Sequence, residues 1–153
     1  MNRSTVVRPG HAEDLPAILS IEAQCGSVTW SPDGFHTTLS DENHVSLVAT
    51  APDNTVRGFI LAQVAADECT VHTIGVLPSC QRHGIGTMLL NGLIMHAERL
   101  GCAMMFLEVR SKNTGAQSFY RCLGFASSGK RKGYYGDDND DAILMSRPLH
   151  LSV

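Results

Sequence analysis

Several features that mark large classes of protein are absent from this sequence. Charged residues make up 18% of the 153 residues and the formal net charge is −3, so no basic surface for nucleic acid is predicted. No run of residues approaches the roughly 20 apolar residues that a membrane-spanning helix needs. The five cysteines are odd in number and lack framework spacing, which favours a reducing compartment. We therefore expect a soluble, cytoplasmic protein that contacts neither nucleic acid nor membrane.

Two segments contain part of a metal-binding motif, but neither contains the complete motif. Cys69 and His72 lie three residues apart in an expected strand, so their side chains would point to opposite faces and could not share one ion. The acidic run 137–141 begins like a calcium loop, but Ala142 stands where that loop requires glycine. No metal site is predicted.

Apolar residues make up 43% of the chain, which is enough for the core of one domain spanning residues 1–153. Hydrophobic periodicity and turn residues predict an α/β (α+β) fold of about seven strands and about four helices. The strands are expected at 5–8, 45–50, 57–64, 69–77, 103–109, 125–130 and 141–147. The helices are expected to begin at Asp14, Ser31, Gly86 and Thr114, the last through a capping box with Gln117.

The most informative segment, residues 70–90, contains an apolar strand, a proline turn, the pair Gly84-x-Gly86 and the start of a helix. Glycines at such a turn allow backbone N–H groups to converge without obstruction by a Cβ, and the helix N-terminus adds partial positive charge. The segment therefore predicts an anion cradle. A Walker A loop is excluded because no Lys-Ser/Thr follows, and the dinucleotide fingerprint is excluded because the third glycine is missing.

Two motifs carry a resemblance to a known family. The order Gln/Arg-x-x-Gly-x-Gly after a strand ending in Val-Leu-Pro resembles the acyl-CoA pyrophosphate loop of the GNAT superfamily of N-acyltransferases. Segment 107–125, with Glu-Val-x-x-x-Asn and Phe-Tyr-x-x-x-Gly-Phe, is similar to the other half of that cofactor site. Together with Trp30 and Tyr134-Tyr135, these motifs resemble the RimI family of ribosomal-protein alanine N-acetyltransferases.

The resemblance implies a single GNAT-type domain with a mixed, mostly antiparallel sheet that splays between the strands at 69–77 and 103–109. It implies acetyl-CoA as the acetyl donor, with no metal. Pantetheine would add like an extra strand, and a backbone N–H near Val76 would stabilise the oxyanion. The cofactor-binding residues would be Ile74, Gly75, Val76, Gln81, Arg82, His83, Gly84, Ile85, Gly86, Thr87, Asn113 and Tyr120.

Acetyl transfer to nitrogen needs a neutral amine and a proton donor for the leaving thiolate. An α-amino group has a pKa of about 7.7–8.0, against about 10.4 for lysine, so a carboxylate can deprotonate it more easily. By motif position Glu108 matches the family's base and Tyr120 its acid. The alternatives are a strand-end carboxylate paired with Arg110 or a lysine, and a tyrosine ring packed in the core.

Other residues also carry two interpretations. Asn113 resembles the side chain that binds pantetheine, but it could equally begin a helix as its N-cap. Trp30, Tyr134 and Tyr135 are expected to bind the acceptor together with Glu108, the two tyrosines from a polar loop. His72 departs from the family, because this strand position is usually apolar or small in relatives.

The sequence thus predicts direct transfer of an acetyl group to a protein N-terminus, that of the N-terminal alanine of small-subunit ribosomal protein eighteen. The partners would be acetyl-CoA and this N-terminal peptide, and the protein would be a monomer or weak dimer. One alternative is an acetyltransferase for a small amine or an internal lysine. Another is a non-catalytic acyl-CoA sensor or interaction module, against which the presence of both Glu108 and Tyr120 counts.

Overall fold

The computed structural model describes residues 4–25, 41–135 and 140–150. Within these ranges the chain forms the strands β1 (Val6–Pro9), β2 (His44–Thr50), β3 (Val56–Ala65), β4 (Glu68–Val76), β5 (Met104–Arg110), β6 (Ala126–Tyr135) and β7 (Asp140–Pro148). The helices are α1 (Leu15–Cys25), α3 (Ile85–Arg99) and α4 (Thr114–Cys122), with short 3₁₀ turns at Ala12–Asp14 and Pro78–Cys80. The expected helix beginning at Ser31 lies outside the described residues. No described helix has the length and apolar character needed to cross a membrane.

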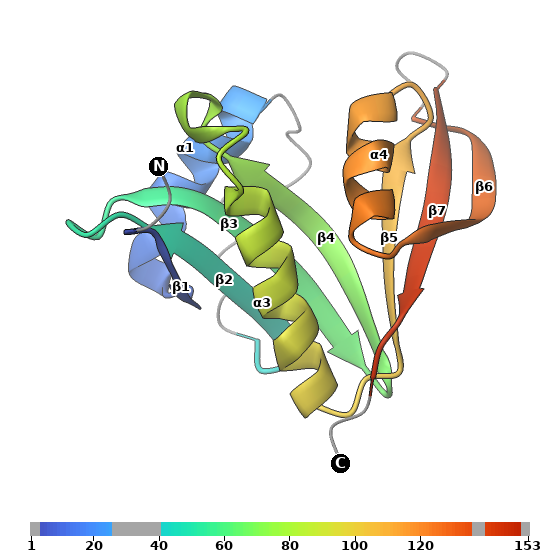
Figure 1. Ribbon diagram of the computed structural model, residues 1–153, viewed down its shortest axis with the longest axis horizontal. Helices are drawn as coiled ribbons and strands as arrows, with labels where there is room; N and C mark the ends of the chain where they lie inside the picture. Colours follow the sequence, from blue (N-terminus) through green and yellow to red (C-terminus); the bar gives the residue numbers. More distant parts are fainter. Residues whose placement is uncertain (1–3, 26–40, 136–139, 151–153) are drawn as a thin grey trace.

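The strands form one sheet in the order β1-β2-β3-β4-β5-β7-β6, and every neighbouring pair is antiparallel except β4 and β5. That parallel pair is short: its register runs only from Glu68↔Met104 to Thr70↔Phe106. Beyond this point the two strands separate, and Figure 1 shows them close at one end and diverging toward the other, with α4 alongside β5. The predicted mixed sheet and its splay are confirmed.

Helices cover both faces of the sheet, and strand β3 shows how the sequence achieves this. Its residue Ile60 packs in the large core cluster beneath α3, which includes Leu89 and Leu93. The neighbouring Phe59 and Leu61 point to the opposite face and pack against α1. Alternate side chains of a strand point to opposite faces, so an apolar run such as this one is buried on both sides.

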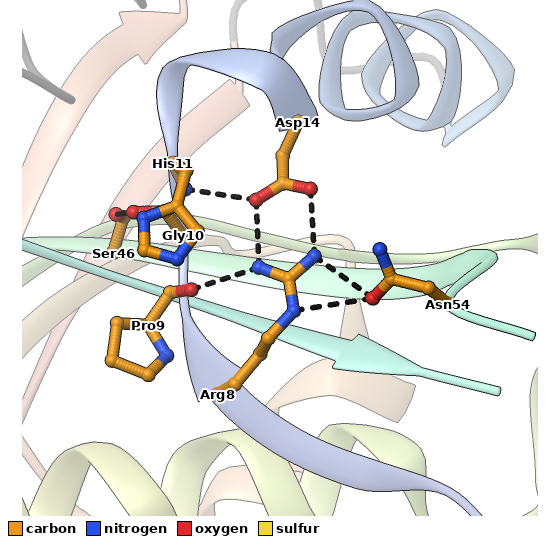
Figure 2. Close-up of polar contacts among 7 residues, drawn as sticks. All are labelled: Arg8, Pro9, Gly10, His11, Asp14, Ser46 and Asn54. Atoms are coloured by element: carbon orange, nitrogen blue, oxygen red, sulfur yellow. Dashed lines mark hydrogen bonds and ion pairs between the residues drawn. The ribbon is translucent and has the colours of Figure 1, made fainter. Parts of the chain in front are cut away.

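A partly buried ion pair fixes the start of α1 to the sheet (Figure 2). Arg8 of β1 donates two parallel hydrogen bonds to Asp14, from Nη1 to Oδ2 and from Nη2 to Oδ1, each at 2.9 Å. Arg8 also donates to Asn54 Oδ1 from the β2–β3 turn, while the backbone N–H of His11 donates to Asp14 at 2.8 Å. The hydrogen bonds from Arg8 hold the pKa of Asp14 below its usual value. This contact orients α1, whose other end reaches the candidate site.

Helix α4 begins at Thr114 as predicted, but the predicted capping box between Thr114 and Gln117 is wrong. The N-cap is Asn113, whose Oδ1 accepts a hydrogen bond from the backbone N–H of Ala116 at 3.1 Å. Gln117, predicted to close a capping box with Thr114, instead donates to two backbone carbonyls at the end of β5, at 3.1 and 2.9 Å. Asn is a stronger N-cap than Thr, which explains why Asn113 caps the helix, and the buried Gln117 amide satisfies carbonyls where the strand ends.

Strand β6 continues further than the sequence suggested. Tyr134 and Tyr135 were predicted to lie in a polar loop, but β6 extends to Tyr135, which pairs with Asp140 of β7. The glycine and the basic residues of this stretch resemble a loop when taken alone. They are tolerated here because β6 is an edge strand, and because the register shifts between Arg131 and Tyr135.

Candidate active site

The gap between β4 and β5 opens into a cleft of about 840 Å³. Its walls come from β4, the loop that follows it, the start of α3, the end of β5 and the first turns of α4. The predicted cofactor residues that line it are Ile74, Gly75, Val76, Gln81, Arg82, Gly84, Ile85, Gly86, Thr87, Asn113 and Tyr120. The predicted base Glu108 lines it as well, whereas His83 lies in the same loop but outside the lining.

The loop between β4 and α3 has the backbone shape of an anion site. Arg82 and Gly84 both adopt left-handed conformations, with φ of 66° and 84°, on either side of His83. Backbone that alternates in handedness forms a concave surface of N–H groups, called a nest, which binds anions. Gly84 is also the N-cap of the 15-residue helix α3, whose first N–H groups have no acceptor within the helix. The loop and the helix start both line the cleft, and their backbone has the shape that the predicted anion cradle requires.

Beyond the short pairing with β5, the edge of β4 that faces the gap pairs with no other described strand. The backbone N–H of Leu77 donates to Arg57 in β3 at 2.9 Å, so alternation turns the peptide groups of Ile74 and Val76 away from β3 and toward the gap. The carbonyl of Val76 accepts hydrogen bonds from Gln81 Nε2 at 3.1 Å and from Cys25 Sγ at 3.4 Å. An extended polyamide could add to this edge as a further strand.

Cys25 is a cleft residue that the sequence did not reveal. It is the last residue of α1 and lines the cleft from the face of the sheet opposite α3. No motif surrounds it, so only its contact with the Val76 carbonyl identifies it.

Glu108 occupies an exposed position near the end of β5. Its Oε1 lies 3.5 Å from Nη2 of Arg131 in β6. The partner is therefore an arginine two strands away, rather than the adjacent Arg110 or a lysine.

Tyr120 combines both interpretations that the sequence allowed. Its ring is buried and meets Phe119 and Phe125 edge-on, with ring centroids 5.2 and 5.9 Å apart. The same residue lines the cleft from α4. Burial raises the pKa of its phenol to about 12, so the hydroxyl keeps its proton at neutral pH and can act as a donor.

Asn113 likewise has a structural role and a place in the cleft. Its Oδ1 is occupied by the helix cap, which leaves the Nδ2 amide as the group that could donate to a bound cofactor. Of the predicted acceptor residues, Trp30 lies outside the described residues. Tyr134 and Tyr135 are placed by their backbone in β6, and their side chains lie outside the description. In the described part of the chain no cluster of three or more His, Cys, Asp or Glu side chains could hold a metal ion.

Residues 15–125 match the family model described as acetyltransferase (GNAT) family. The chain belongs to the GNAT family of acetyltransferases. GNAT enzymes use acetyl-CoA as the acetyl donor, and this GNAT chain is an N-acetyltransferase. Its cleft is lined by the loop at Gly84, by the edge of β4 and by Tyr120.

The GNAT relatives agree with the resemblance to RimI. The chain is 37% identical over 140 residues to the [ribosomal protein bS18]-alanine N-acetyltransferase of Salmonella typhimurium, covering 90% of this chain and 93% of the relative. It is 36% identical over 141 residues to the N-alpha-acetyltransferase RimI of Mycobacterium tuberculosis, covering 88% and 86%. The crystal structure of the ribosomal-protein-S18-alanine N-acetyltransferase of Escherichia coli superimposes with a TM-score of 0.89 at 33% identity, covering 97% and 96%.

Proposed function

We propose that this enzyme transfers the acetyl group of acetyl-CoA to the N-terminal α-amine of a protein, and that its acceptor is the N-terminal alanine of ribosomal protein bS18. One observation carries the proposal. The anion cradle, the free edge of β4, Glu108 and Tyr120 line a single cleft. The identity of the acceptor is supported by the 37% identity to an enzyme of that name over 90% of this chain.

The cofactor would lie along the cleft with its pyrophosphate at the N–H groups that follow Gly84. The pantetheine arm would then run beside β4, pairing with the peptide groups of Ile74 and Val76, while the Nδ2 amide of Asn113 donates from the opposite wall. Strand addition of this kind gives backbone affinity without requiring particular side chains. The thioester would reach the part of the gap between the diverging strands, and the N–H of Val76 would stabilise its oxyanion.

In the acetyl transfer, the acceptor nitrogen must lose two protons. The amine arrives as an ammonium ion and must lose one proton before it attacks the thioester carbon. A second proton leaves as the C–N bond forms. In the proposed mechanism Glu108 accepts a proton from this nitrogen, directly or through water. The C–S bond then breaks, Tyr120 donates its proton to the thiolate sulfur, and the phenol is restored from solvent.

The test is a panel of synthetic acceptors incubated with acetyl-CoA and followed by release of the free CoA thiol. The panel contains peptides that begin with the bS18 sequence, the same peptide with Ser, Met or Gly at its first position, and a polyamine. We expect the alanine peptide to have the highest kcat/KM. Preference for the polyamine would contradict the proposal and favour a small-amine acetyltransferase instead.

A further inference from the structure

His72 is the residue of β4 that stands across the gap from Glu108. The parallel register runs through Thr70↔Phe106, so two residues further along each strand it reaches His72 and Glu108, just beyond the point where pairing stops. Both side chains line the cleft. The two residues therefore flank the narrow beginning of the gap from opposite strands.

The side chains of His72 and Glu108 also share a face of the sheet. Leu107 packs in the core cluster beneath α3, so alternation turns Glu108 to the other face. On β4 the register is irregular, because Val71 pairs with Ala62 and Thr73 pairs with Leu61, which leaves His72 as the extra residue of a bulge. The face of His72 follows from its contact, because its Nε2 lies 3.2 Å from Oε1 of Gln63. Gln63 lies on β3 two residues beyond Leu61, which packs on the α1 side.

Polar side chains of β3 and β2 lie beside His72 on the sheet. Beyond Gln63, the ring of His44 in β2 lies 5.9 Å away, and Asp41 Oδ2 lies 3.2 Å from the far side of that ring at His44 Nδ1. Desolvation by the surrounding protein, followed by the proximity of His44, lowers the pKa of the His72 imidazole. His72 is therefore neutral at physiological pH and can accept a proton.

Thr73, the next residue of β4, contacts the buried carboxyl group of Glu22 on α1. Thr73 donates its hydroxyl to Glu22 Oε2 at 3.0 Å, while Glu22 Oε1 has no hydrogen-bond partner among the described residues. Burial raises the pKa of Glu22, so this group is less readily ionised than an ordinary glutamate. From β5, Arg110 lines the same cleft, and the guanidinium of Arg131 lies against Glu108.

We propose that His72 is a second proton acceptor in the acetyl transfer: the acceptor nitrogen binds between the His72 imidazole and the Glu108 carboxylate, and each removes one of its two protons. The inference rests on the proposed function, which supplies an amine that must lose two protons. The ammonium proton passes to one group and the proton released on C–N bond formation passes to the other. Both protons are returned to solvent after the acetylated peptide leaves.

The experiment compares His72→Gln with His150→Gln, a control that removes an exposed imidazole outside the cleft. His72 is itself solvent-exposed, so His72→Gln should keep the wild-type Tm. With the alanine peptide we expect kcat to fall about tenfold, with KM for the peptide changing less than threefold. In the wild-type enzyme kcat should decrease as the pH is lowered, because His72 becomes protonated. This decrease should be smaller in His72→Gln and unchanged in His150→Gln.

A second measurement follows the imidazole itself by NMR of the ¹³C-labelled protein. Titration with CoA and the alanine peptide should shift the His72 resonances and its pKa, and should leave those of His150 unchanged. Wild-type kcat in His72→Gln at every pH, together with an unmoved His72 resonance when the peptide is bound, would overturn the inference and leave the proposed function standing. If the wild-type enzyme fails to acetylate the α-amine, the proposed function fails first and the inference fails with it.

Discussion

The Glu108→Gln variant removes the proposed base and should leave folding and acetyl-CoA binding intact. The side chain is exposed near the end of β5, and its described ion pair is the 3.5 Å contact with Arg131. An exposed pair of this kind contributes about 0–1 kcal/mol to stability, so Glu108→Gln should fold normally. The cradle at Gly84 does not depend on Glu108, so the Kd for acetyl-CoA should stay within about twofold of wild type.

The size of the kinetic effect follows from the acceptor. An α-amine with a pKa near 8 is about one-tenth neutral at pH 7 and about nine-tenths neutral at pH 9. Loss of a general base costs typically about 10²- to 10⁴-fold. We therefore expect kcat/KM of Glu108→Gln to fall about 100-fold at pH 7. Because solution deprotonation replaces part of the base's work, kcat/KM should recover about tenfold between pH 7 and pH 9.

The assay is steady-state acetylation of the alanine peptide between pH 6 and pH 9.5, with calorimetric titration of acetyl-CoA as the control for binding. Wild-type rates should rise less steeply with pH than those of Glu108→Gln. A variant with unchanged kcat/KM at pH 7 would remove Glu108 as the base. A uniform loss at every pH would indicate a role in binding the acceptor rather than in deprotonating it.

Three further changes test the donor and the scaffold. Tyr120→Phe keeps the aromatic packing but removes the phenol, so kcat should fall at least about tenfold with Tm nearly unchanged, and a wild-type kcat would assign the proton to water. Gly84→Val should abolish acetyl-CoA binding in calorimetry, because φ of 84° disfavours a branched side chain at the cradle; a folded variant that binds normally would show that the loop lies elsewhere. Asp14→Asn should lower the free energy of unfolding by about 1–3 kcal/mol at neutral pH. Because the pKa of Asp14 is held below its ordinary 3.8, this difference should be complete above that pH and shrink as pH falls below it; a constant difference down to pH 2 would contradict the ion pair with Arg8.

Local patterns in the sequence were enough to predict most of the scaffold. The strand at 103–109 was predicted from its continuous apolar run, and the strand-to-helix turn was predicted from Gly84-x-Gly86. Errors arose where a residue's partner was not local. The basic end of β6 resembled a loop because nothing in its own sequence indicates pairing with β7. The capping box at α4 was wrong because the Gln117 side chain bonds the end of β5 instead of closing onto Thr114.

In the candidate site, too, local motifs could be predicted and contacts between distant residues could not. Glu108 and Tyr120 could be selected from motifs, and both line the cleft. Their partners could not be predicted, because the contact of Arg131 with Glu108 depends on the register of three strands. The position of His72 opposite Glu108 likewise depends on where the β4–β5 pairing ends. Strand register is set by tertiary packing, which a single sequence does not display.

The central claim is that the acetyl group is delivered to a terminal α-amine in the gap between β4 and β5. The most direct measurement uses one peptide that begins with alanine and contains an internal lysine, incubated with acetyl-CoA and sequenced by tandem mass spectrometry. We predict a single acetyl group on the α-nitrogen of the alanine, and no reaction when that nitrogen is blocked. Acetylation of the lysine in the blocked peptide, at a rate comparable to that of the free peptide, would contradict the account.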